Sequence, residues 1–247
     1  MFKFIKTTSF CAHTFCPVPL NESSVVVDLG ANIGEFSRQL NKITGCQCYA
    51  VEASPELYSR IPQTNKIKVF NYAISDKNDP VILNLSSDPE GNSIHHLPAT
   101  LVTNTVTVQG ITLPSFLAQN GISEVDLLKI DIEGAEIELF NSLTDEELLK
   151  FKQITIEFHD FIPAMNLDKD VALVKKRLKA LGFYYINLYQ HSNDDVLYLN
   201  RRLLKVPFLE YFYLAYVNKY LRGFFRRLKK KIRRAPGLRL SGQLPQK

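Results

Sequence analysis

The sequence predicts an α/β fold built on a doubly wound sheet, and three observations carry this prediction. Short apolar or β-branched runs alternate with helical patterns through most of the chain, which is typical of βαβ units. The first such run leads through the glycine-containing turn Gly30–Gly34 into a helical pattern. The chain has 247 residues, of which 45% are hydrophobic and 22% charged, so it can bury one sizeable core and is not disordered throughout.

The first third of the chain contains three expected strands. Ser54 is a suitable N-cap for a helix that begins at Pro55, because a serine oxygen accepts a hydrogen bond from the free N–H groups there and proline lacks one. The expected elements are, in order, a strand at Ser24–Leu29, a helix at Glu35–Ile43, a strand at Cys48–Glu52, the helix that Ser54 caps, and a strand at Lys68–Ile74.

The middle of the chain departs from this alternation. Val81–Leu85 and Thr103–Gln109 both alternate apolar and polar side chains, and the polar loop Ser86–Ala99 lies between them. Alternation of this kind predicts strands with one exposed face. We therefore expect an added β-ribbon here rather than a crossover unit.

The alternation of strands and helices then resumes to residue 199. Gly182 follows the longest helical pattern and is suited to end it. The expected elements are a helix at Leu113–Asn120, a strand at Val125–Ile130, a helix from Ala135 to Asn141, a strand at Gln153–Phe158, a helix at Lys169–Leu181, and a closing antiparallel pair at Tyr184–Leu188 and Val196–Leu199.

Charge divides the chain into two unlike parts. Residues 201–247 hold 14 basic side chains and one acidic side chain, a net charge of +13, whereas residues 1–200 hold 16 basic and 24 acidic ones, a net charge of −8. We therefore divide the chain into an N-terminal extension (1–22), a Rossmann-like domain (23–200) and a basic tail (201–247). A basic tail on an acidic body indicates an anionic partner for the tail alone.

The four cysteines do not indicate a disulfide framework or a metal centre. Cys11, His13 and Cys16 lack a second ligand pair at zinc spacing, so no metal is expected. Cys46 and Cys48 are expected to be buried thiols. Polar residues interrupt the apolar start of the chain, which argues against a secretory signal. A cytoplasmic location with free thiols is the resulting expectation.

Acidic side chains stand at the carboxyl ends of the expected strands, where doubly wound sheets bind ligands. They are Asp28, Glu52, Asp131 and Glu157. Gly30 and Gly34 allow a tight turn and a close approach of the backbone to a ligand. Glu52 follows Gly30 by 22 residues, near the offset of about 20 expected for a carboxylate that binds a ribose diol. These features predict a nucleoside-containing ligand.

The charge of these residues favours one nucleoside-containing cofactor over another. A dinucleotide brings a pyrophosphate, whereas Asn32 occupies a position of the turn where a glycine is expected and Asp28 stands just before it. No phosphate-binding loop of the G-x-x-x-x-G-K-[ST] type is present. S-adenosylmethionine carries a sulfonium and an ammonium but no phosphate, and carboxylates attract both cations. S-adenosylmethionine is therefore preferred to NAD.

Several segments resemble a known family. They are VVVDLGANIGEFS, VEASPELY, NYAISD, ITLPSFLAQNGISEVDLLKIDIEGAEIELF and ITIEFHDF. In order and spacing they resemble the FkbM family of class I S-adenosylmethionine-dependent methyltransferases, over roughly Val25 to Leu199, and KIDIEGAE is the most distinctive block. The resemblance implies a Rossmann-like methyltransferase fold and methyl transfer to an oxygen, often on a sugar or natural-product hydroxyl.

The resemblance also implies roles for residues at the strand ends. The glycine turn would hold the methionine end of S-adenosylmethionine, Glu52 would bind the ribose hydroxyls, and Ala53 with the Asn71–Ala73 turn would flank the adenine. Tyr72 could stack on the base or belong to the core. The full set of expected cofactor-binding residues is Asp28, Gly30, Ala31, Asn32, Gly34, Glu52, Ala53, Ala73 and Asp131.

Catalysis requires a base for the acceptor hydroxyl. Glu157 and His159 are two residues apart and would face one way on a strand. Histidine titrates near neutral pH, so His159 is the first choice as general base and Asp131 the second, with Glu157 beside them. Glu133 and Glu136 could serve the site or the positive end of the next helix dipole. Glu133, His95 and His96 are the weaker candidates for acceptor contacts.

The basic tail has the pattern of an amphipathic helix. Apolar or aromatic residues recur every four positions from Phe208 to Ile232, and basic residues surround the later half. This pattern is typical of a helix that lies in an anionic membrane interface, which would place the protein at the inner membrane face. A helix packed on the body, a dimerisation helix and a nucleic-acid clamp are the alternatives for residues 208–234. Ala235–Lys247 is expected to be disordered.

Three functional hypotheses follow from these features. The first is an S-adenosylmethionine-dependent O-methyltransferase that acts on a sugar, glycolipid or natural-product acceptor. The second is a non-catalytic nucleoside-binding module recruited by its tail. The third is an RNA methyltransferase whose tail contacts phosphates; the acidic body disfavours nucleic acid as a ligand of the core.

Overall fold

The protein forms a seven-stranded sheet with helices on both faces. The computed structural model describes residues 6–86, 92–94, 102–161, 167–187 and 193–217. The strand order in the sheet is β11-β12-β10-β9-β3-β4-β5. Only β12 runs antiparallel to its neighbours, and the other strands are parallel to one another. The strands are β3 (Val25–Leu29), β4 (Gln47–Val51), β5 (Ile67–Phe70), β9 (Leu127–Ile130), β10 (Gln153–Ile156), β11 (Phe183–Asn187) and β12 (Val196–Asn200).

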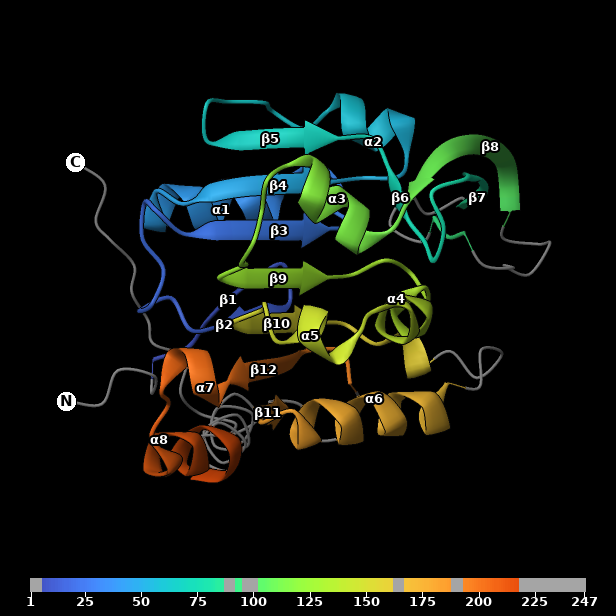
Figure 1. The fold of residues 1–247 in the computed structure, drawn as a ribbon. Coiled ribbons are helices and arrows are strands. Elements are labelled where there is room, and N and C mark those ends of the chain that lie inside the picture. Colours follow the sequence, from blue (N-terminus) through green and yellow to red (C-terminus); the bar gives the residue numbers. More distant parts are fainter. Residues whose placement is uncertain (1–5, 87–91, 95–101, 162–166, 188–192, 218–247) are drawn as a thin grey trace, which may run out of the picture.

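This arrangement confirms the predicted doubly wound α/β fold. The chain moves outward from β3 to β5 on one side of the sheet and from β9 through β10 to the edge strand β11 on the other, after which β12 inserts between β10 and β11. The direction of winding therefore reverses between β3 and β9. The arrowheads of β3, β4, β9 and β10 all point to the same edge of the sheet (Figure 1). A ligand site is expected at this edge, at the point of reversal.

Alternating side chains of the strands divide the core between the two faces. Val27, Leu29 and Tyr49 pack on one face with residues of α3, α4, α5 and α6, whereas Val26 and Cys48 pack on the other with α1 and Phe15. The helices are α1 (Glu35–Thr44), α2 (Pro55–Ser59), α3 (Leu113–Gln119), α4 (Glu136–Ser142), α5 (Asp145–Leu148), α6 (Asp168–Ala180), α7 (Arg201–Leu204) and α8 (Phe208–Phe212).

The predicted β-ribbon is present beside the carboxyl edge of the sheet (Figure 1). β7 (Pro80–Ser86) pairs with β8 (Val102–Ile111) in antiparallel fashion, and β6 (Ala73–Ile74) adds to β8 in parallel. Residues 68–74 were expected as one strand. They instead form the end of β5 and all of β6, which belong to different sheets, because the chain breaks at Asn71, whose side-chain amide donates to the carbonyl oxygens of Glu52 and Ala53.

The N-terminal residues belong to the folded body. β1 (Thr8–Phe10) and β2 (His13–Phe15) form a hairpin, and β2 contacts β10 and β12. The Thr14 hydroxyl and backbone N–H both donate to Asp195, at 2.5 and 2.8 Å. The Cys16 backbone exchanges two hydrogen bonds with the side chain of Gln153. Residues 8–16 therefore complete the core on the α1 face, although the sequence suggested an extension outside the domain.

The start of the basic tail packs on the body. α8 continues into a π-helical turn, η4 (Tyr213–Val217). Leu214 is fully buried against β11 and β12 residues, and the rings of Tyr184 and Tyr211 stack with centroids 4.0 Å apart. The rest of the predicted amphipathic helix lies outside the described residues. Among the residues that the structure describes, no helix has both the length and the apolar character needed to span a bilayer.

Two local expectations need correction. β10 ends at Ile156, and His159 lies in the short 3-10 helix η2 (His159–Phe161), so Glu157 and His159 do not share the face of a strand. Cys46 precedes β4 rather than lying within it. Both Cys46 and Cys48 are nevertheless buried, as predicted, and their sulfur atoms are 3.5 Å apart.

Candidate active site

A cleft of about 580 Å³ opens at the carboxyl edge of the sheet. Its walls come from the turns after β3, β4, β9 and β10, from the hairpin between β1 and β2, and from the β-ribbon. The side of the cleft formed after β3 and β4 is called here the turn side, and the side formed after β9 and β10 the acidic side. Lining residues include Gly30, Ala31, Asn32, Glu52, Ala53, Tyr72, Ala73, Leu83, Asn92, Ile94, Lys129, Asp131, Glu133 and Glu157.

The glycine turn is shaped by two close approaches. A Cβ atom on Gly30 would lie 1.7 Å from the carbonyl oxygen of Asp131, and one on Gly34 would lie 2.5 Å from the side chain of Ile61. Both glycines have positive φ, and Asn32 between them has a φ of 54°, a conformation that asparagine tolerates better than most residues. The backbone path of the turn therefore requires glycine at positions 30 and 34 and favours asparagine at position 32.

Glu52 is fixed at the end of β4. Its carboxylate accepts hydrogen bonds from the backbone N–H groups of Asn32 and Ser54, each at 2.8 Å. Burial raises the pKa of Glu52, and these two hydrogen bonds oppose that shift. Lone pairs on both carboxylate oxygens remain for another donor. Glu52 can thus receive the hydroxyls of a ribose without moving.

An apolar wall continues from Glu52 to the ribbon. Ala53, Tyr72 and Ala73 line the cleft, and Tyr72 also packs against the main core cluster. Leu83 of β7 and Ile94 also line the cleft and pack in one cluster with Ala53 and Ala73. Asn84 and Ser93 form an antiparallel bridge, which brings part of the predicted Ser86–Ala99 loop to the cleft. His95 and His96 lie outside the described residues.

Lys129 is a buried cation beneath the cleft that the sequence analysis did not identify. Its ammonium group donates to the carbonyl oxygen of Gly30 at 2.6 Å and to that of Leu29 at 3.3 Å. It also lies 3.4 Å from Asp28 Oδ1 and 3.3 Å from Asp131 Oδ2. Burial favours the neutral amine, but attraction to the two carboxylates prevails and raises the pKa of Lys129 to about 12. Lys129 therefore links the ends of β3 and β9.

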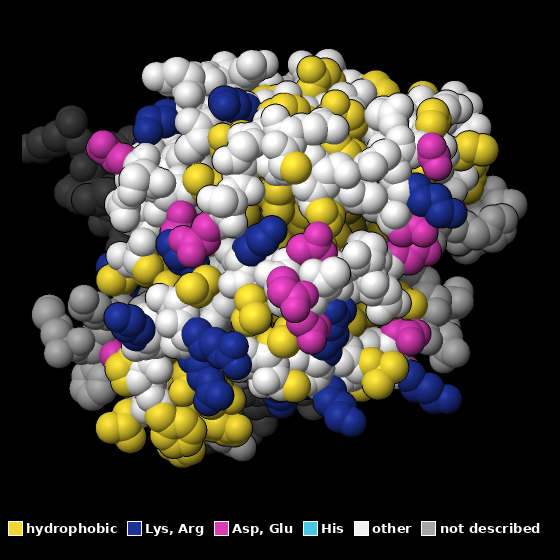
Figure 2. Space-filling model, viewed as in Figure 1, with side chains coloured by type: hydrophobic (Ala, Val, Ile, Leu, Met, Phe, Trp, Pro, Cys, Tyr) yellow, Lys and Arg dark blue, Asp and Glu magenta, His cyan; other side chains and the backbone are white. Residues whose placement is uncertain are grey.

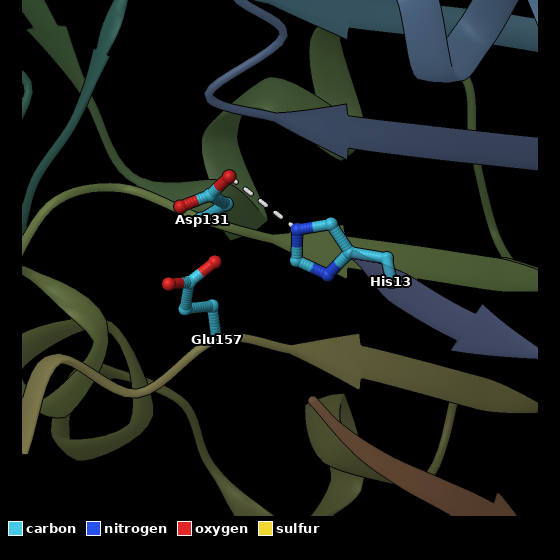
Figure 3. A group of neighbouring side chains, drawn as sticks. All are labelled: His13, Asp131 and Glu157. Atoms are coloured by element: carbon cyan, nitrogen blue, oxygen red, sulfur yellow. Dashed lines mark hydrogen bonds and ion pairs between the residues drawn. The ribbon is translucent and has the colours of Figure 1, made fainter. Parts of the chain in front are cut away.

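His13 reaches the same carboxylate from the N-terminal hairpin (Figure 3). His13 is fully buried, and its Nε2 atom lies 3.3 Å from Asp131 Oδ2. Burial opposes ionisation of Asp131, but Lys129 and His13 outweigh it, and the pKa of Asp131 lies below its usual range. Glu157 points toward this pair from the end of β10 (Figure 3). Three separate segments thus meet at one carboxylate.

His159 is held between two glutamates. Its Nδ1 atom lies 2.9 Å from Glu136 Oε1, and its Nε2 atom lies 3.1 Å from Glu133 Oε2. Burial favours the neutral ring, but the hydrogen bonds to Glu133 and Glu136 raise the pKa of His159 to about 11. His159 is therefore protonated at neutral pH, which does not suit the general-base role that its ordinary pKa suggested.

The pKa of Glu157, unlike that of His159, lies near neutral pH. Glu157 lines the cleft and is half-buried, and burial together with repulsion from Asp131 raises its pKa to about 7. A carboxyl group with this pKa gains and loses a proton near neutral pH, which is the range in which a general base works best. Of the three candidates for this role, Glu157 is the one whose titration and position both fit.

The structure brings most of the predicted site residues to one cleft, but four of them, Asp28, Gly34, Glu136 and His159, do not line it. Asp28 is fully buried behind the turn, where its carboxylate accepts from the Ser37 hydroxyl at 2.7 Å. Gly34 faces Ile61, and neither Asp28 nor Gly34 lines the cleft. Glu136 is buried and accepts hydrogen bonds from backbone N–H groups at the start of α4. Asp28, Gly34 and Glu136 shape the site from behind, and His159 contacts it through Glu133, which lines the cleft.

Two groups of side chains have the composition of metal ligands. They are His13 with Asp131 and Glu157, and Asp131 with Glu133 and His159. In both groups Asp131 is already paired with the Lys129 ammonium, and in the second His159 carries its own proton between two glutamates. Lys129 and His159 thus already give carboxylates in both groups cationic partners.

The known proteins that are similar to this chain include methyltransferases. Methyltransferase 1 of Beauveria bassiana (strain ARSEF 2860) is 24% identical over 206 residues, which cover 73% of this chain and 80% of that protein. Among solved structures, the Methanococcus jannaschii fibrillarin pre-rRNA processing protein is 14% identical with a TM-score of 0.41 and covers 78% of this chain and 69% of its own. A SAM-dependent methyltransferase from Aquifex aeolicus is 14% identical with a TM-score of 0.37. That match covers 72% of this chain and 82% of the Aquifex aeolicus protein.

A family model covers most of the part of the chain that builds the cleft. The methyltransferase FkbM domain matches residues 28–185, from the end of β3 into β11. This match spans more than half of the chain and contains the glycine turn, Glu52 and the residues of the acidic side from Lys129 to His159. The chain belongs to the FkbM family of methyltransferases.

Proposed function

We propose that this methyltransferase uses S-adenosylmethionine to methylate a hydroxyl group of a sugar, glycolipid or natural-product acceptor, with Glu157 as the general base. The single observation that carries the proposal is the cleft itself. It places a pre-positioned carboxylate, Glu52, at one end and a carboxyl group that titrates near neutral pH, Glu157, at the other.

The residues of the turn side fit S-adenosylmethionine. The Gly30–Asn32 backbone follows a path that leaves room for a ligand against it, and Glu52 is ready to accept from a ribose diol. Ala53, Tyr72 and Ala73 offer an apolar wall for the adenine. Asp131, on the acidic side directly after β9, remains ionised because of Lys129 and His13, so a ligand cation near it is attracted.

The proposed chemistry assigns separate tasks to the acidic side. S-adenosylmethionine supplies an electrophilic methyl group, so that a carbon–oxygen bond forms at the acceptor as the carbon–sulfur bond breaks. Glu157 takes the proton from the acceptor hydroxyl. Lys129 and His13 hold the Asp131 side chain in place, and His159 holds Glu133 and Glu136 in the same manner.

The character of the cleft also supports an uncharged acceptor. Glu133 and Glu157 line its acidic side, and Leu83, Asn92 and Ile94 line the ribbon side. Carboxylates repel the phosphates of a nucleic acid, whereas they accept hydrogen bonds from the hydroxyls of a sugar. RNA is therefore the less supported acceptor, and a hydroxylated neutral molecule or a glycolipid headgroup fits better.

Binding and turnover test the proposal in two steps. Isothermal titration should detect S-adenosylmethionine and S-adenosylhomocysteine but not NAD; binding of NAD alone would refute the cofactor assignment. With an accepted hydroxylated substrate, kcat/KM should rise with pH as Glu157 of the free enzyme loses its proton, around pH 7.

The role of Glu157 is tested by Glu157→Gln. This variant should lower kcat by about 10²–10⁴-fold and abolish the acid limb of the pH profile. Glu56→Gln on the exposed surface of α2 is the matched control and should leave both unchanged. A Glu157→Gln enzyme with the parent pH profile would exclude Glu157 as the base and would leave His159 and Asp131 to be tested in the same way.

A further inference from the structure

We propose that the exposed face of α8 and η4 docks onto an anionic lipid bilayer. This face, called here the aromatic patch, consists of Phe208, Leu209, Phe212 and Tyr216. It lies apart from the cleft and shares no residue with it. The proposal is therefore independent of the reaction that the cleft carries out.

The opposite face of the same helical segment is anchored to the body. Leu214 is fully buried with Val206, Leu197 and Leu199, and the Tyr211 ring stacks on Tyr184. These contacts fix the rotation of the segment about its axis. The aromatic patch is consequently turned away from the core, although three of its four side chains, Phe208, Leu209 and Phe212, are fully apolar.

The exposure of the patch is large for side chains of this type. The exposed fractions are 63% for Phe208, 69% for Leu209, 47% for Phe212 and 49% for Tyr216. The rings of Phe208, Phe212 and Tyr216 adjoin one another, with successive centroids 6.5 and 5.2 Å apart. Other large hydrophobics exposed in the described ranges come from separate elements. A contiguous exposed patch of this kind indicates an interaction surface.

Basic side chains accompany the patch. Figure 2 shows hydrophobic side chains gathered over α8, with Lys and Arg side chains beside them. Arg201, Arg202 and Lys205 are exposed in and just after α7. In the sequence, residues 218–234 add nine Lys or Arg and no Asp or Glu. Basic charge beside exposed aromatic rings matches the chemistry of a bilayer surface, which offers anionic headgroups above an apolar layer.

The same features argue against the other occupants. A second copy of the chain would bring two strongly basic tails together, and like charges repel. A nucleic acid would satisfy the basic residues, but phosphates offer nothing to four exposed apolar side chains on one anchored face. Phenylalanine and tyrosine, by contrast, are favoured where hydrocarbon meets headgroups. We therefore commit to an anionic bilayer.

The absence of tryptophan from the sequence allows a site-specific test. A Phe212→Trp variant carries one indole in the patch, and Leu173→Trp, at a position on α6 that is 62% exposed, is the matched control. With phosphatidylcholine vesicles that contain phosphatidylglycerol, the Phe212→Trp emission should shift to shorter wavelength and the Leu173→Trp emission should not. No shift in Phe212→Trp, or equal shifts in both, would overturn the proposal.

Vesicle co-sedimentation measures the strength of binding. The double variant Phe208→Ser/Phe212→Ser should weaken binding to the anionic vesicles by about 10-fold or more, because each side chain would lose the burial of its ring. The control Leu173→Ser should bind as the parent does, and pure phosphatidylcholine should bind the parent weakly. Parent-like binding by the double variant would refute the patch as the contact.

Two further outcomes would assign the patch to another occupant and overturn the proposal. One is a parent protein that is dimeric in solution and becomes monomeric with Phe208→Ser/Phe212→Ser. The other is retention of RNA that the same double variant loses while vesicle binding persists. Circular dichroism of each variant verifies that the exposed substitutions leave the fold intact.

Discussion

The two sides of the cleft are built by different means. On the turn side, the backbone determines the residues: Gly30 is required by the approach of Asp131, and Glu52 is held by two backbone N–H groups. On the acidic side, ion pairs hold the side chains in place. Lys129 lies between Asp28 and Asp131, and His159 lies between Glu133 and Glu136.

This difference predicts how each side of the cleft responds to an amino-acid substitution. A backbone-determined site keeps its shape when one side chain is altered, because the remaining hydrogen bonds persist. A network of buried charges fails as a unit, because removal of one member leaves its partner charged and unpaired. The acidic side should therefore be the more fragile part of the protein.

The largest effect is expected from Lys129→Met. The substitution keeps the volume of the side chain but leaves Asp28 and Asp131 without their cation, so the free energy of unfolding should fall by about 3–5 kcal/mol. Urea unfolding measures it. Lys152→Met is the matched control, because Lys152 also contacts two carboxylates but at a partly exposed site, and its cost should stay below about 1 kcal/mol.

A double variant sharpens this test. Lys129→Met/Asp28→Asn removes one of the two uncompensated charges and should recover part of the lost stability. If Lys129→Met were no more costly than Lys152→Met, the acidic side would not depend on its buried cation, and the contrast between the two sides would fail.

An intermediate effect is expected on the turn side from Glu52→Gln. The substitution retains the shape of the side chain but removes the charge, which weakens hydrogen bonds from a ribose diol. The affinity for S-adenosylmethionine should fall by about 10–100-fold. The free energy of unfolding should fall by about 1–3 kcal/mol, because the amide NH2 faces one of the two backbone N–H groups that Glu52 now satisfies. Calorimetric titration measures the affinity, and Glu56→Gln serves as the control. Unchanged affinity would show that Glu52 does not contact the cofactor.

The smallest effect concerns stability and pH at Glu157. The pKa of Glu157 is raised from 4.5 to about 7 in the folded protein, so the folded state holds a proton that the unfolded chain releases. Stability therefore declines as the pH rises from about 4.5 to 7. Glu157→Gln should be more stable than the parent at pH 8, by less than about 1 kcal/mol because water screens this half-buried group, and equal to it near pH 4.

The comparison of unfolding at these two pH values measures this difference. A parent and a Glu157→Gln variant with parallel stability profiles would mean that the carboxyl group titrates normally. The acidic side would then lack the raised pKa on which the proposed base depends.

The sequence predicts the turn side better than the acidic side. Regular spacing and local rules locate the glycine turn, the Ser54 cap and Glu52, because each depends on residues close in the chain. The Thr144–Glu147 capping box is also a local signal that predicts α5, although no helix was expected there. The break at Asn71 was missed because its cause is a hydrogen bond to a neighbouring strand end.

The acidic side depends on contacts that no local pattern reveals. His159 is ordinary in the sequence, and only its two glutamate partners make it a cation. Lys129 stands in an apolar run, and a lysine in an otherwise buried strand is itself a signal, because a buried ammonium needs a partner. His13 was considered only as a metal ligand beside two cysteines, since 118 residues separate it from Asp131.

The N-terminal hairpin has a consequence for how the protein is made. β1 and β2 are made before every strand of the seven-stranded sheet, yet Thr14 bonds to Asp195, 181 residues later. A nascent chain grows from its N-terminal side, so these two hydrogen bonds form only after the segment before β12 has been made. Until then the hairpin lacks its partners on β12, and His13 lacks part of the support that holds it against Asp131.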